Sequence, residues 1–409
     1  MKAAYLTLGC KLNFAETATY ERALSAAGYE TVSWREKADI YVINTCTVTE
    51  TSDSKSRNLI RKVHRINPDA RIAVTGCSAQ LRREAINAIE GVSAVFGASE
   101  KAMLVPWILD LPMPESQDFF PAYSTVGERT RAFLKVQDGC NNFCAYCTVP
   151  YARGGSRNQS ICGIVREAGE IAASGAKEIV LTGVNTGDFG RSTGESFLDL
   201  IKALNDVEGI ERYRISSIEP NLLTEETIDW IASGTKFLPH FHIPLQVGSD
   251  ELLAKMGRRY DTAYFRDRIE YIRHALERPG KAKVFFGIDL MAGLPGETDS
   301  LFEESLHFIE ELRPAFIHIF PYSRRPGTPA YSMPGQVSES IKAERVKVLE
   351  ELCGRLHDGF IEANRGLQEK VLFESRERGG MMSGFTGNYI KITRPYDPEK
   401  VGEICDVII

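Results

Sequence analysis

The chain contains 409 residues, of which 43% are hydrophobic and 25% are charged, and it carries a net charge of −6. This is the composition of a globular protein long enough for two or three domains of roughly 150 residues each, and the negative charge excludes a general polycation. No apolar run approaches the roughly 18 residues that cross a bilayer, and the first residues lack the core and cleavage site of a signal peptide. We therefore expect a cytoplasmic protein with no membrane partner.

The first hundred residues alternate between predicted strands and predicted helices. The strands are continuous apolar runs, as expected for strands buried on both faces. Alternation of this kind predicts a parallel sheet covered by helices on both sides. A stretch with four prolines at 104–128 then predicts a linker. The predicted strands are 3–8, 39–44 and 71–75, and the predicted helices are 14–27, 54–66 and 81–89.

A second alternating series follows the linker. Its six strand–helix units predict an open, partial (β/α)6 barrel rather than the eight units of a complete one. A long amphipathic helix is predicted at 339–363, and the tail changes to short strands separated by Gly and Pro, which favours a small β-barrel or half-barrel. The fold class is thus α/β, with predicted domains at 1–103, 129–366 and 367–409, the first two joined by the linker. The predicted barrel strands are 132–137, 178–182, 212–217, 241–245, 283–290 and 316–320.

Three cysteines share one loop directly after the first barrel strand, in the sequence GCNNFCAYC. Thiols in the cytoplasm stay reduced, and nine cysteines are an odd number, so clustered cysteines favour a metal centre over disulfides. A structural zinc site usually has four ligands from two paired motifs, whereas Cys140, Cys144 and Cys147 have no nearby paired partner. Three thiolates on a [4Fe–4S] cluster leave one iron open. That iron can bind S-adenosylmethionine, whose one-electron cleavage releases a 5′-deoxyadenosyl radical.

Cys10, Cys46 and Cys77 each lie just beyond one of the three predicted N-terminal strands. Parallel strands align their carboxyl ends, so these residues are expected to converge on one crevice. Three soft thiolates suit a second iron–sulphur cluster, also with an open iron that can hold the sulphur to be inserted. The alternative is three unrelated buried cysteines.

The CxxxCxxC loop with Tyr146 before its last cysteine resembles the radical S-adenosylmethionine superfamily. This resemblance implies that Tyr146 packs near the adenine and that the other strand ends hold the cofactor. Ser216, Glu219 and Gln246 become candidates for its ribose or methionine part. No catalytic residue beyond the cluster ligands is implied. The complete set of candidate cofactor contacts is Tyr146, Gly183, Asn185, Ser216, Glu219, Gln246, Ile288 and Phe320.

The whole chain resembles the radical S-adenosylmethionine methylthiotransferase family, and its tail resembles that family's TRAM domain. The resemblance implies two [4Fe–4S] clusters, S-adenosylmethionine and a one-electron donor of the flavodoxin or ferredoxin type. The motifs TLGCKLNFAE, NTCTVTETSDSKSR and FPYSRRPGTPA look most like the branch acting on N6-threonylcarbamoyladenosine at position 37 of tRNA. The implied reaction replaces C–H by C–SCH3 at an unactivated carbon, which requires cofactor chemistry.

Two alternatives remain open at this point. One is the same chemistry on isopentenyladenosine tRNA or on an aspartate of a ribosomal protein, and the other is a non-catalytic, metal-stabilised RNA-binding protein. RNA binding requires cationic contacts to phosphates. The tail has no excess of basic residues, so the candidates lie elsewhere. They are Arg57, Arg61, Arg153, Arg157, Arg258 and Arg325.

Overall fold

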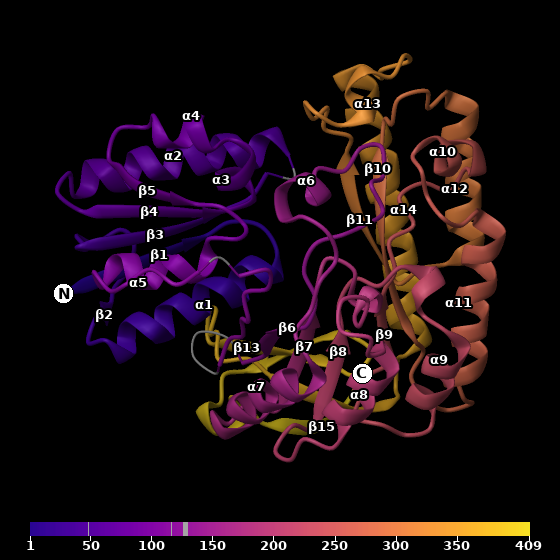
Figure 1. Cartoon of the computed structure of the whole chain (residues 1–409). Helices are drawn as coiled ribbons and strands as arrows, with labels where there is room; N and C mark the ends of the chain where they lie inside the picture. The colour runs from indigo at the N-terminus through magenta and orange to yellow at the C-terminus, as the bar shows by residue number, and fades with distance from the viewer. Residues whose placement is uncertain (48, 116, 126–129) are drawn as a thin grey trace.

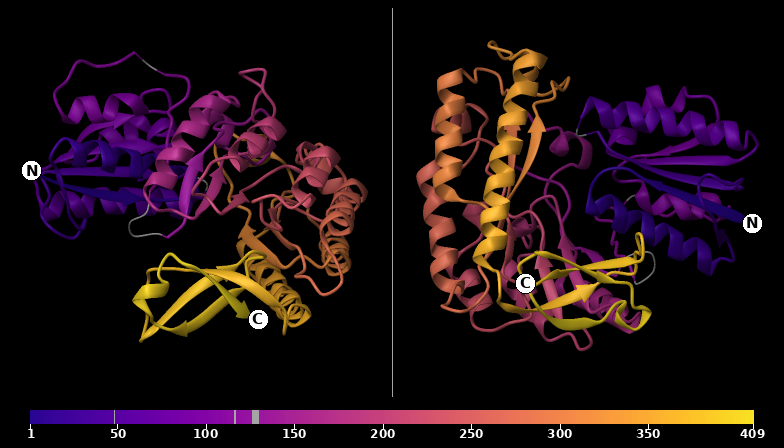
Figure 2. Two further views of the ribbon diagram at one scale, coloured as in Figure 1. Left: turned by 90° about the horizontal axis from the view of Figure 1, so that it is seen from below. Right: turned by 180° about the vertical axis from the view of Figure 1, so that it is seen from behind.

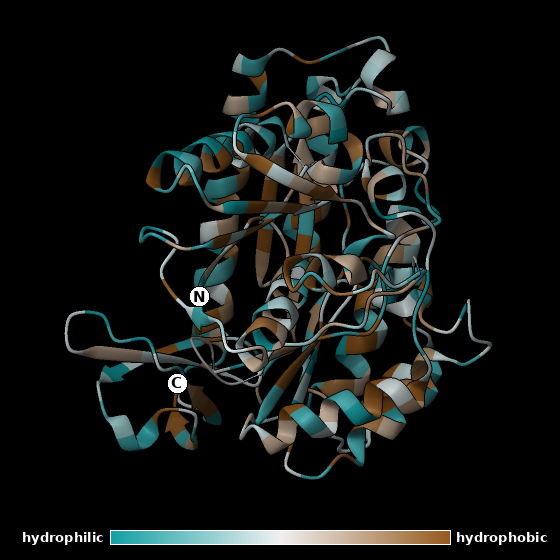
Figure 3. Ribbon diagram, turned by 60° about the vertical axis from the view of Figure 1, so that its left-hand side comes forward, coloured by the Kyte–Doolittle hydropathy of each residue, from teal (hydrophilic) through white to brown (hydrophobic). Residues whose placement is uncertain are grey.

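The computed structural model describes residues 1–47, 49–115, 117–125 and 130–409. An N-terminal α/β layer lies beside a partial barrel, and a C-terminal antiparallel sheet lies beneath the barrel strands (Figure 1). Strands are predominantly coloured as hydrophobic, whereas the outer helices carry both hydrophobic and hydrophilic residues (Figure 3). The predicted α/β fold class with a parallel sheet, an open barrel and a small β unit is therefore confirmed.

The N-terminal sheet is parallel and has five strands in the order β2-β1-β3-β4-β5. The three predicted strands form its centre. The two outer strands were not predicted, because β2 has only two residues and β5 is mostly half-buried, so neither gives a continuous apolar run. The strands are β1 (Lys2–Thr7), β2 (Glu30–Thr31), β3 (Ile40–Thr45), β4 (Arg71–Gly76) and β5 (Val92–Phe96).

Five helices cover the two faces of this sheet. One face packs against α1 (Lys11–Ala26) and α5 (Leu104–Ile108), and the other packs against α2 (Glu50–Ile66), α3 (Cys77–Leu81) and α4 (Arg83–Asn87). Helix α5 lies where the sequence predicted a linker. Its Leu104 and Ile108 are almost completely buried against the sheet, so the N-terminal layer extends beyond residue 103. The predicted helix at 81–89 is instead two short helices that meet at Arg82.

The barrel consists of six parallel strands in chain order. Two three-stranded sheets, β6-β7-β8 and β9-β10-β11, are joined by single parallel bridges from Tyr213 to Phe237 and from Ser217 to His242. The predicted six-unit open barrel is confirmed. The strands are β6 (Ala132–Lys135), β7 (Glu178–Thr182), β8 (Arg212–Ile215), β9 (His240–His242), β10 (Phe285–Ala292) and β11 (Phe316–Pro321).

Alternate residues of each barrel strand point to opposite faces. On β10, Phe286, Ile288 and Leu290 belong to the core beneath the outer helices, whereas Gly287 and Asp289 point to the inner face of the barrel. The long predicted helix has its predicted bounds. The helices of this region are α6 (Val149–Arg153), α7 (Ile161–Ala173), α8 (Phe197–Asn205), α9 (Glu225–Ala232), α10 (Asp250–Lys255), α11 (Thr262–Leu276), α12 (Asp299–Leu312), α13 (Pro329–Ser332) and α14 (Glu339–Ala363).

The C-terminal residues form a four-stranded antiparallel sheet in the order β14-β13-β12-β15, which lies at the amino end of the barrel strands (Figure 2). Buried arginines of β8 hold it there. Arg212 donates to the carbonyls of Lys370 (3.3 Å) and Phe385 (3.1 Å), and Arg214 donates to those of Thr386 (2.7 Å) and Gly387 (2.8 Å). The strands are β12 (Gln368–Phe373), β13 (Met381–Thr386), β14 (Lys391–Pro395) and β15 (Ile404–Ile408).

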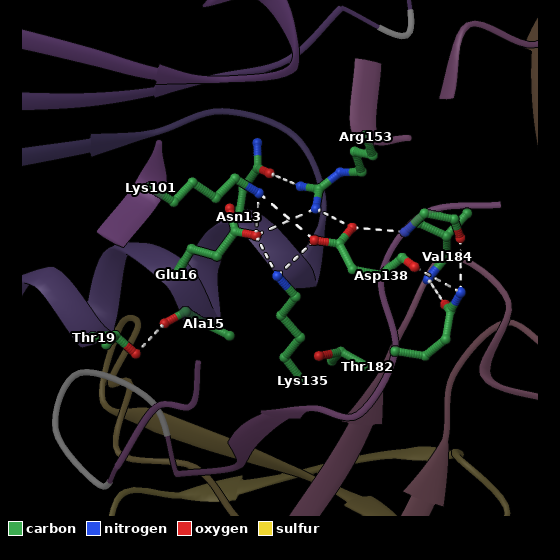
Figure 4. Close-up of polar contacts among 12 residues, drawn as sticks. Asn13, Ala15, Glu16, Thr19, Lys101, Lys135, Asp138, Arg153, Thr182 and Val184 are labelled. Carbon is green, nitrogen blue, oxygen red and sulfur yellow. Dashed lines mark hydrogen bonds and ion pairs between the residues drawn. The ribbon is translucent and has the colours of Figure 1, made fainter. Parts of the chain in front are cut away.

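Helix α1 joins the N-terminal layer to the inner face of the barrel through a buried ionic network (Figure 4). The Glu16 carboxylate is fully buried and lies 2.6 Å from Lys101 Nζ, 3.0 Å from Lys135 Nζ and 3.3 Å from Arg153 Nη1. Asp138 bonds the same cations, 2.6 Å from Lys135 and 2.7 Å from Arg153. Burial alone raises a carboxyl pKa, but these cations outweigh it and hold the pKa of Glu16 far below its usual range.

Among the described residues, no helix combines the length and apolarity that a bilayer crossing demands.

Replacement of Glu16 by Gln tests how much this network stabilises the fold. Removing one charge of a buried, paired set costs about 3–5 kcal/mol, so we expect E16Q to lower the free energy of unfolding by that amount at pH 7. Because the folded-state pKa of Glu16 is depressed, its contribution is present above the unfolded-state value of about 4.3 and decreases as the pH falls below it. The two proteins should thus converge in acid.

The measurement is urea denaturation of the cluster-free protein, followed by circular dichroism at a series of pH values. Glu344→Gln, at an exposed position of α14, is the matched control. Equal stability of E16Q and E344Q at pH 7 would contradict the stabilising role.

Candidate functional site

The loop after β6 carries Cys140 and Cys144, which are buried, and Cys147, which is half-buried. Gly139 begins the loop with φ +74°, and a Cβ there would lie 1.9 Å from the Gly155 carbonyl oxygen, so only glycine allows this close packing. The N–H of Asn142 points to Cys140 Sγ at 3.5 Å, and the N–H of Val149 points to Cys147 Sγ at 3.4 Å. Both donors favour the thiolate form of these sulphurs.

Arg258 links this loop to the end of β8. Its guanidinium donates to Cys144 Sγ (3.3 Å), to Tyr146 Oη (3.3 Å) and to both carboxylate oxygens of Glu219 (2.6 and 2.7 Å). Its side chain is only 3% exposed. The prediction of Arg258 as an RNA contact is therefore wrong. It positions the cysteine loop and the Glu219 carboxylate relative to each other.

Gln137 binds the backbone that follows β7, and it was not among the residues that the sequence singled out. Gln137 Oε1 accepts from the N–H groups of Val184 (2.9 Å) and Asn185 (3.0 Å). A Cβ on Gly183 would lie 3.0 Å from the same oxygen, so the glycine gives the backbone room to bend here. The only available signal was a polar residue at the end of an apolar strand, directly before the cysteine loop.

Two buried polar atoms at this rim have no hydrogen-bond partner among the described residues. They are Asn185 Nδ2 and Ser216 Oγ, although Asn185 Oδ1 accepts from the Glu219 N–H (3.1 Å). Buried polar groups are normally paired, so these atoms fit a polar ligand at the strand ends. The amino-acid part of S-adenosylmethionine has the groups that would satisfy them.

The remaining cofactor candidates divide by the face on which they lie. Gln246 adopts φ +77°, and its backbone pairs with Asp289 and Met291, which places it at the rim. Phe320 points to the inner face and is 44% exposed. Ile288 is completely buried in the core under the helices. Strand alternation turns its side chain away from the inner face, so only the backbone of Ile288 remains a candidate cofactor contact.

Gly9, which precedes Cys10, and Gly76, which precedes Cys77, pack closely against the Thr45–Cys46 segment. A Cβ on Gly9 would lie 2.9 Å from Cys46 Sγ, and a Cβ on Gly76 would lie 2.3 Å from the Thr45 carbonyl oxygen. Both glycines have φ +98°, a conformation that other residues rarely adopt. The Gly-Cys pairs at the ends of β1 and β4 are thus required for the close approach of the three chain segments.

Asp53 ties two of these cysteine segments to the barrel. Its fully buried carboxylate accepts from Thr47 Oγ1 (3.2 Å), beside Cys46, and from Ser78 Oγ (2.8 Å), beside Cys77. Arg325, which follows β11, bonds Asp53 and also donates to Thr47 Oγ1 (2.8 Å). Burial opposes ionisation, but these bonds lower the pKa of Asp53. Arg325 is 3% exposed, so its prediction as an RNA contact is wrong.

Arg153 occupies the boundary between the two cysteine groups. It ends α6, which follows Cys147 and packs against α3, the helix that Cys77 begins (Figure 1). The guanidinium is 3% exposed and bonds Asn13 Oδ1 (2.5 Å) and Asp138 (2.7 Å). Burial raises the pKa of the Cys77 thiol, and the charge of Arg153 opposes this rise. Arg153 thus favours bound thiolates, and its prediction as an RNA contact is wrong.

The donor sets fit polynuclear clusters better than single ions. A zinc ion holds its sulphurs at about 2.3 Å, so its ligands lie close together. Among the described residues, only His242, Asp289 and His318 place three ligand atoms within 4.8 Å of one another. Neither cysteine group is this compact, as expected where several irons separate the thiolates. Burial raises the pKa of Cys147 to about 12 and that of Cys140 above its usual value, so metal binding must displace protons.

The other predicted RNA contacts are closer to the surface. Arg61 is exposed on α2, Arg57 is half-buried 3.6 Å from Glu50, and Arg157 is half-buried near Asp138. A hollow of about 230 Å³ lies between the N-terminal layer and the barrel loops. It is lined by Thr47, Leu81, Arg82, Thr148, Tyr151, Arg325, Pro326 and Gly327.

A three-thiol loop after the first strand of an open parallel barrel, next to unsatisfied polar atoms at the strand ends, defines a radical S-adenosylmethionine enzyme. Two family models match the chain: "Uncharacterized protein family UPF0004" over residues 2–97 and "Radical SAM superfamily" over residues 134–309. A solved radical S-adenosylmethionine methyltransferase, TsrM from Kitasatospora setae, has the same fold with a TM-score of 0.59 and 14% identity. The match covers 93% of this chain and 80% of that one.

Relatives match over the whole chain. The threonylcarbamoyladenosine tRNA methylthiotransferase MtaB of Bacillus subtilis is 39% identical over 99% of this chain and 93% of the relative. The enzyme of the same name from Aquifex aeolicus is 36% identical over 100% of both. A tRNA-2-methylthio-N(6)-dimethylallyladenosine synthase of Pelotomaculum thermopropionicum is 31% identical over 100% of this chain and 95% of the relative. The chain belongs to the methylthiotransferase family of radical S-adenosylmethionine enzymes, which use S-adenosylmethionine and [4Fe–4S] clusters.

We propose that Cys140, Cys144 and Cys147 hold one cluster and that Cys10, Cys46 and Cys77 hold the other. Two cubane clusters contain roughly eight irons. In Cys46→Ala we therefore expect about half of the iron and sulphide to be lost, with no methylthio product. Cys162→Ala, an exposed thiol at the start of α7, should keep both. Elemental analysis of the anaerobically reconstituted proteins measures this, and full iron content in Cys46→Ala would exclude the second cluster.

The unpaired hydroxyl of Ser216 gives a test of the cofactor position. If it bonds S-adenosylmethionine, Ser216→Ala should weaken cofactor binding about 5- to 10-fold, since one neutral hydrogen bond contributes about 1 kcal/mol. The apo-protein should be equally or more stable, because a buried unsatisfied group is removed. Equilibrium dialysis and thermal unfolding measure the two quantities. Unchanged cofactor affinity with raised stability would show that the buried hydroxyl destabilises the apo-protein and does not bind the cofactor.

Proposed function

We propose that this protein converts N6-threonylcarbamoyladenosine at position 37 of tRNA to its 2-methylthio derivative. Five relatives at 34–39% identity carry the name of that activity, and the alignments extend over 91–100% of this chain. The structural observation that supports the proposal is the packing of α3, which Cys77 begins, against α6, which follows Cys147. A radical enzyme that also inserts sulphur needs both sites beside one substrate.

The bound cofactors would supply one-electron cleavage of S-adenosylmethionine, which permits hydrogen removal from an unactivated carbon, together with a sulphur and a methyl group. The protein supplies position and environment. Arg258 fixes the cysteine loop relative to Glu219, and Gln137 fixes the loop after β7. Asp53 and Arg325 hold the N-terminal cysteine segments against the barrel.

The same proposal includes a tRNA partner, a protein that reduces the enzyme and a cytoplasmic location. Arg61 and Arg57 on α2 and the half-buried Arg157 are the predicted arginines still placed near solvent, and we assign phosphate contacts to them. We assign the RNA-binding TRAM-like role to residues 367–409, the barrel to 129–366 and the sulphur-delivering domain to the N-terminal layer. A flavodoxin- or ferredoxin-type protein would supply single electrons in the cytoplasm.

The decisive experiment is mass spectrometry of digested tRNA after incubation with reconstituted protein, reductant and S-adenosylmethionine. The tRNA pool contains both threonylcarbamoyl- and isopentenyl-adenosine. We expect a methylthio gain on the threonylcarbamoyl nucleoside alone. A gain on the isopentenyl nucleoside would keep the chemistry and overturn the substrate, and cofactor cleavage without any gain would favour a protein substrate. If the protein contains zinc and does not cleave S-adenosylmethionine, the result would favour a non-catalytic, metal-stabilised RNA-binding protein.

A further inference from the structure

Large apolar side chains lie exposed around the hollow between the N-terminal layer and the barrel loops. Tyr151 of α6 and Leu81 of α3 line this hollow, and both are exposed. Phe143 is 57% exposed, and its ring meets that of Tyr151 edge to face with centroids 5.9 Å apart. Tyr331, also exposed, lies on α13, which closely follows the hollow residues Pro326–Gly327 in the chain. A group of exposed apolar side chains of this kind marks an interaction surface.

Two arginines of this surface have no acidic partner. Arg259 donates to a backbone carbonyl of the cysteine loop (3.2 Å), and Arg324 donates to the Tyr331 carbonyl (2.6 Å) and lies 4.4 Å from the centre of the Tyr331 ring. Both arginines are exposed, and neither forms an ion pair with a carboxylate in the described ranges. Glu50, the exposed carboxylate nearby, is paired with Arg82 at 3.7 Å. The surface thus presents two unpaired cations to an acidic partner. We call it the loop surface, and it consists of Leu81, Phe143, Tyr151, Arg259, Arg324 and Tyr331.

The loop surface covers the outer side of the cysteine loop. Phe143 directly precedes Cys144 and adopts φ +49°, and its side chain is exposed whereas Cys144 is buried. The backbone of Ala145 holds the loop between the end of α10 and the start of α13 through hydrogen bonds of 2.9 and 2.8 Å. The sulphur of Cys144 faces Arg258, which bonds Glu219 at the strand ends. One side of the loop therefore faces the cofactor candidates, and the other faces solvent.

RNA and an acidic protein are the two anionic partners that exposed aromatic and arginine side chains suit. The position of the loop surface distinguishes them. The substrate base must reach the strand-end side of the loop, where the unpaired polar atoms of Asn185 and Ser216 lie. The C-terminal sheet, to which we assign RNA binding, and α13 lie at opposite ends of the molecule (Figure 1). The solvent side of the loop is left for a second partner, which favours a protein.

The proposed function requires such a second partner, because a radical enzyme of this class receives single electrons from a carrier. Electron tunnelling weakens steeply with distance, so a carrier must dock where the cover over the cluster is thin. Phe143 and Cys144 are consecutive residues, so only the loop itself separates the loop surface from the sulphurs. Electron-transfer complexes are small and transient, which suits a surface of a few exposed side chains.

We propose that the loop surface docks an acidic, flavodoxin-type protein that reduces the cluster of the cysteine loop. The inference rests on the proposed function and names the docking site of its electron donor. Arg259 and Arg324 attract the acidic carrier. A flavodoxin holds its flavin in a crevice at the strand ends of its sheet, and the flat, apolar edge of the flavin fits the aromatic rings of Phe143 and Tyr151.

The step transfers one electron and no atoms. The anionic, fully reduced flavin loses one electron and becomes its neutral, one-electron-oxidised form, and the cluster gains that electron. No covalent bond forms or breaks, and no proton moves between the two proteins.

The test measures binding of a purified flavodoxin, with its flavin oxidised, to the anaerobically reconstituted holoenzyme by isothermal titration calorimetry at low and high salt. The variants are Tyr151→Ser, the double variant Arg259→Gln/Arg324→Gln, and Phe143→Ser with its iron content measured. Arg278→Gln is the matched control. Arg278 is likewise exposed and bonds only backbone carbonyls among the described residues, but it precedes β10 and so lies at the amino end of the barrel strands.

Tyr151→Ser and Phe143→Ser should each weaken flavodoxin binding about 10-fold, as expected for an aromatic side chain at the centre of an interface. The double arginine variant should weaken it about 3- to 20-fold at low salt and lose most of the salt dependence. Arg278→Gln should bind as the wild type does. With dithionite, a small reductant that needs no docking, the variants should cleave S-adenosylmethionine at the wild-type rate, whereas cleavage driven by reduced flavodoxin should fall with the loss of binding.

The inference would be overturned if the wild type showed no saturable flavodoxin binding, or if Tyr151→Ser and the double arginine variant both bound undiminished. A loss of affinity for an anticodon stem-loop RNA in these variants, with flavodoxin binding intact, would make the loop surface an RNA site. Sensitivity of ferredoxin binding alone would exclude the flavin carrier. Failure of the proposed function is distinct from all of these: flavodoxin would then still drive cofactor cleavage, but the threonylcarbamoyl nucleoside would gain no methylthio group.

Discussion

The structure depends on a set of charges that have been removed from water together. Glu16 and Asp138 are buried with Lys101, Lys135 and Arg153, and these five residues come from α1, from the segment before α5, from β6 and its loop, and from α6 (Figure 4). Each charge is tolerable only while its partners stay in place. Loss of one partner would leave a buried charge uncompensated, so the network stabilises the fold only while the N-terminal layer is packed against the barrel. The same arrangement packs α3, which Cys77 begins, against α6, which follows Cys147.

The excess of positive charge in this network has a chemical consequence. Three cations surround two carboxylates, and Arg153 lies near enough to the N-terminal cysteines to act on the pKa of Cys77. Buried thiols resist ionisation, yet a cluster binds thiolates. A buried cation beside them reduces that cost. Arg153, which joins the N-terminal layer to the barrel, therefore also favours the thiolate form of Cys77. It contributes both to stability and to cluster assembly.

Glycines at the strand ends allow close packing of the segments that carry the cysteines. Gly9, Gly76 and Gly139 have positive φ values at three different strand ends, and each permits a contact that a Cβ would block. Asp53 then joins two cysteine segments to Arg325 of the barrel. On the inner face, His242, Asp289 and His318 from three neighbouring strands place their ligand atoms within 4.8 Å of one another.

The sequence by itself determined the three central strands of the N-terminal sheet, the six barrel strands and the position of the six cysteines after strands. These are local properties: apolar periodicity defines each element, and parallel topology aligns the ends. It could not determine that α5 replaces part of the linker, because its burial depends on the sheet surface beside it. It also could not separate buried arginines from surface ones. Arg325 and Asp53 lie 272 residues apart, and no local pattern records such a pair. Only the tertiary structure turned the side chain of Ile288 away from the inner face and placed Arg153, Arg258 and Arg325 in buried ion pairs, because burial and charge pairing are decided by neighbours in space.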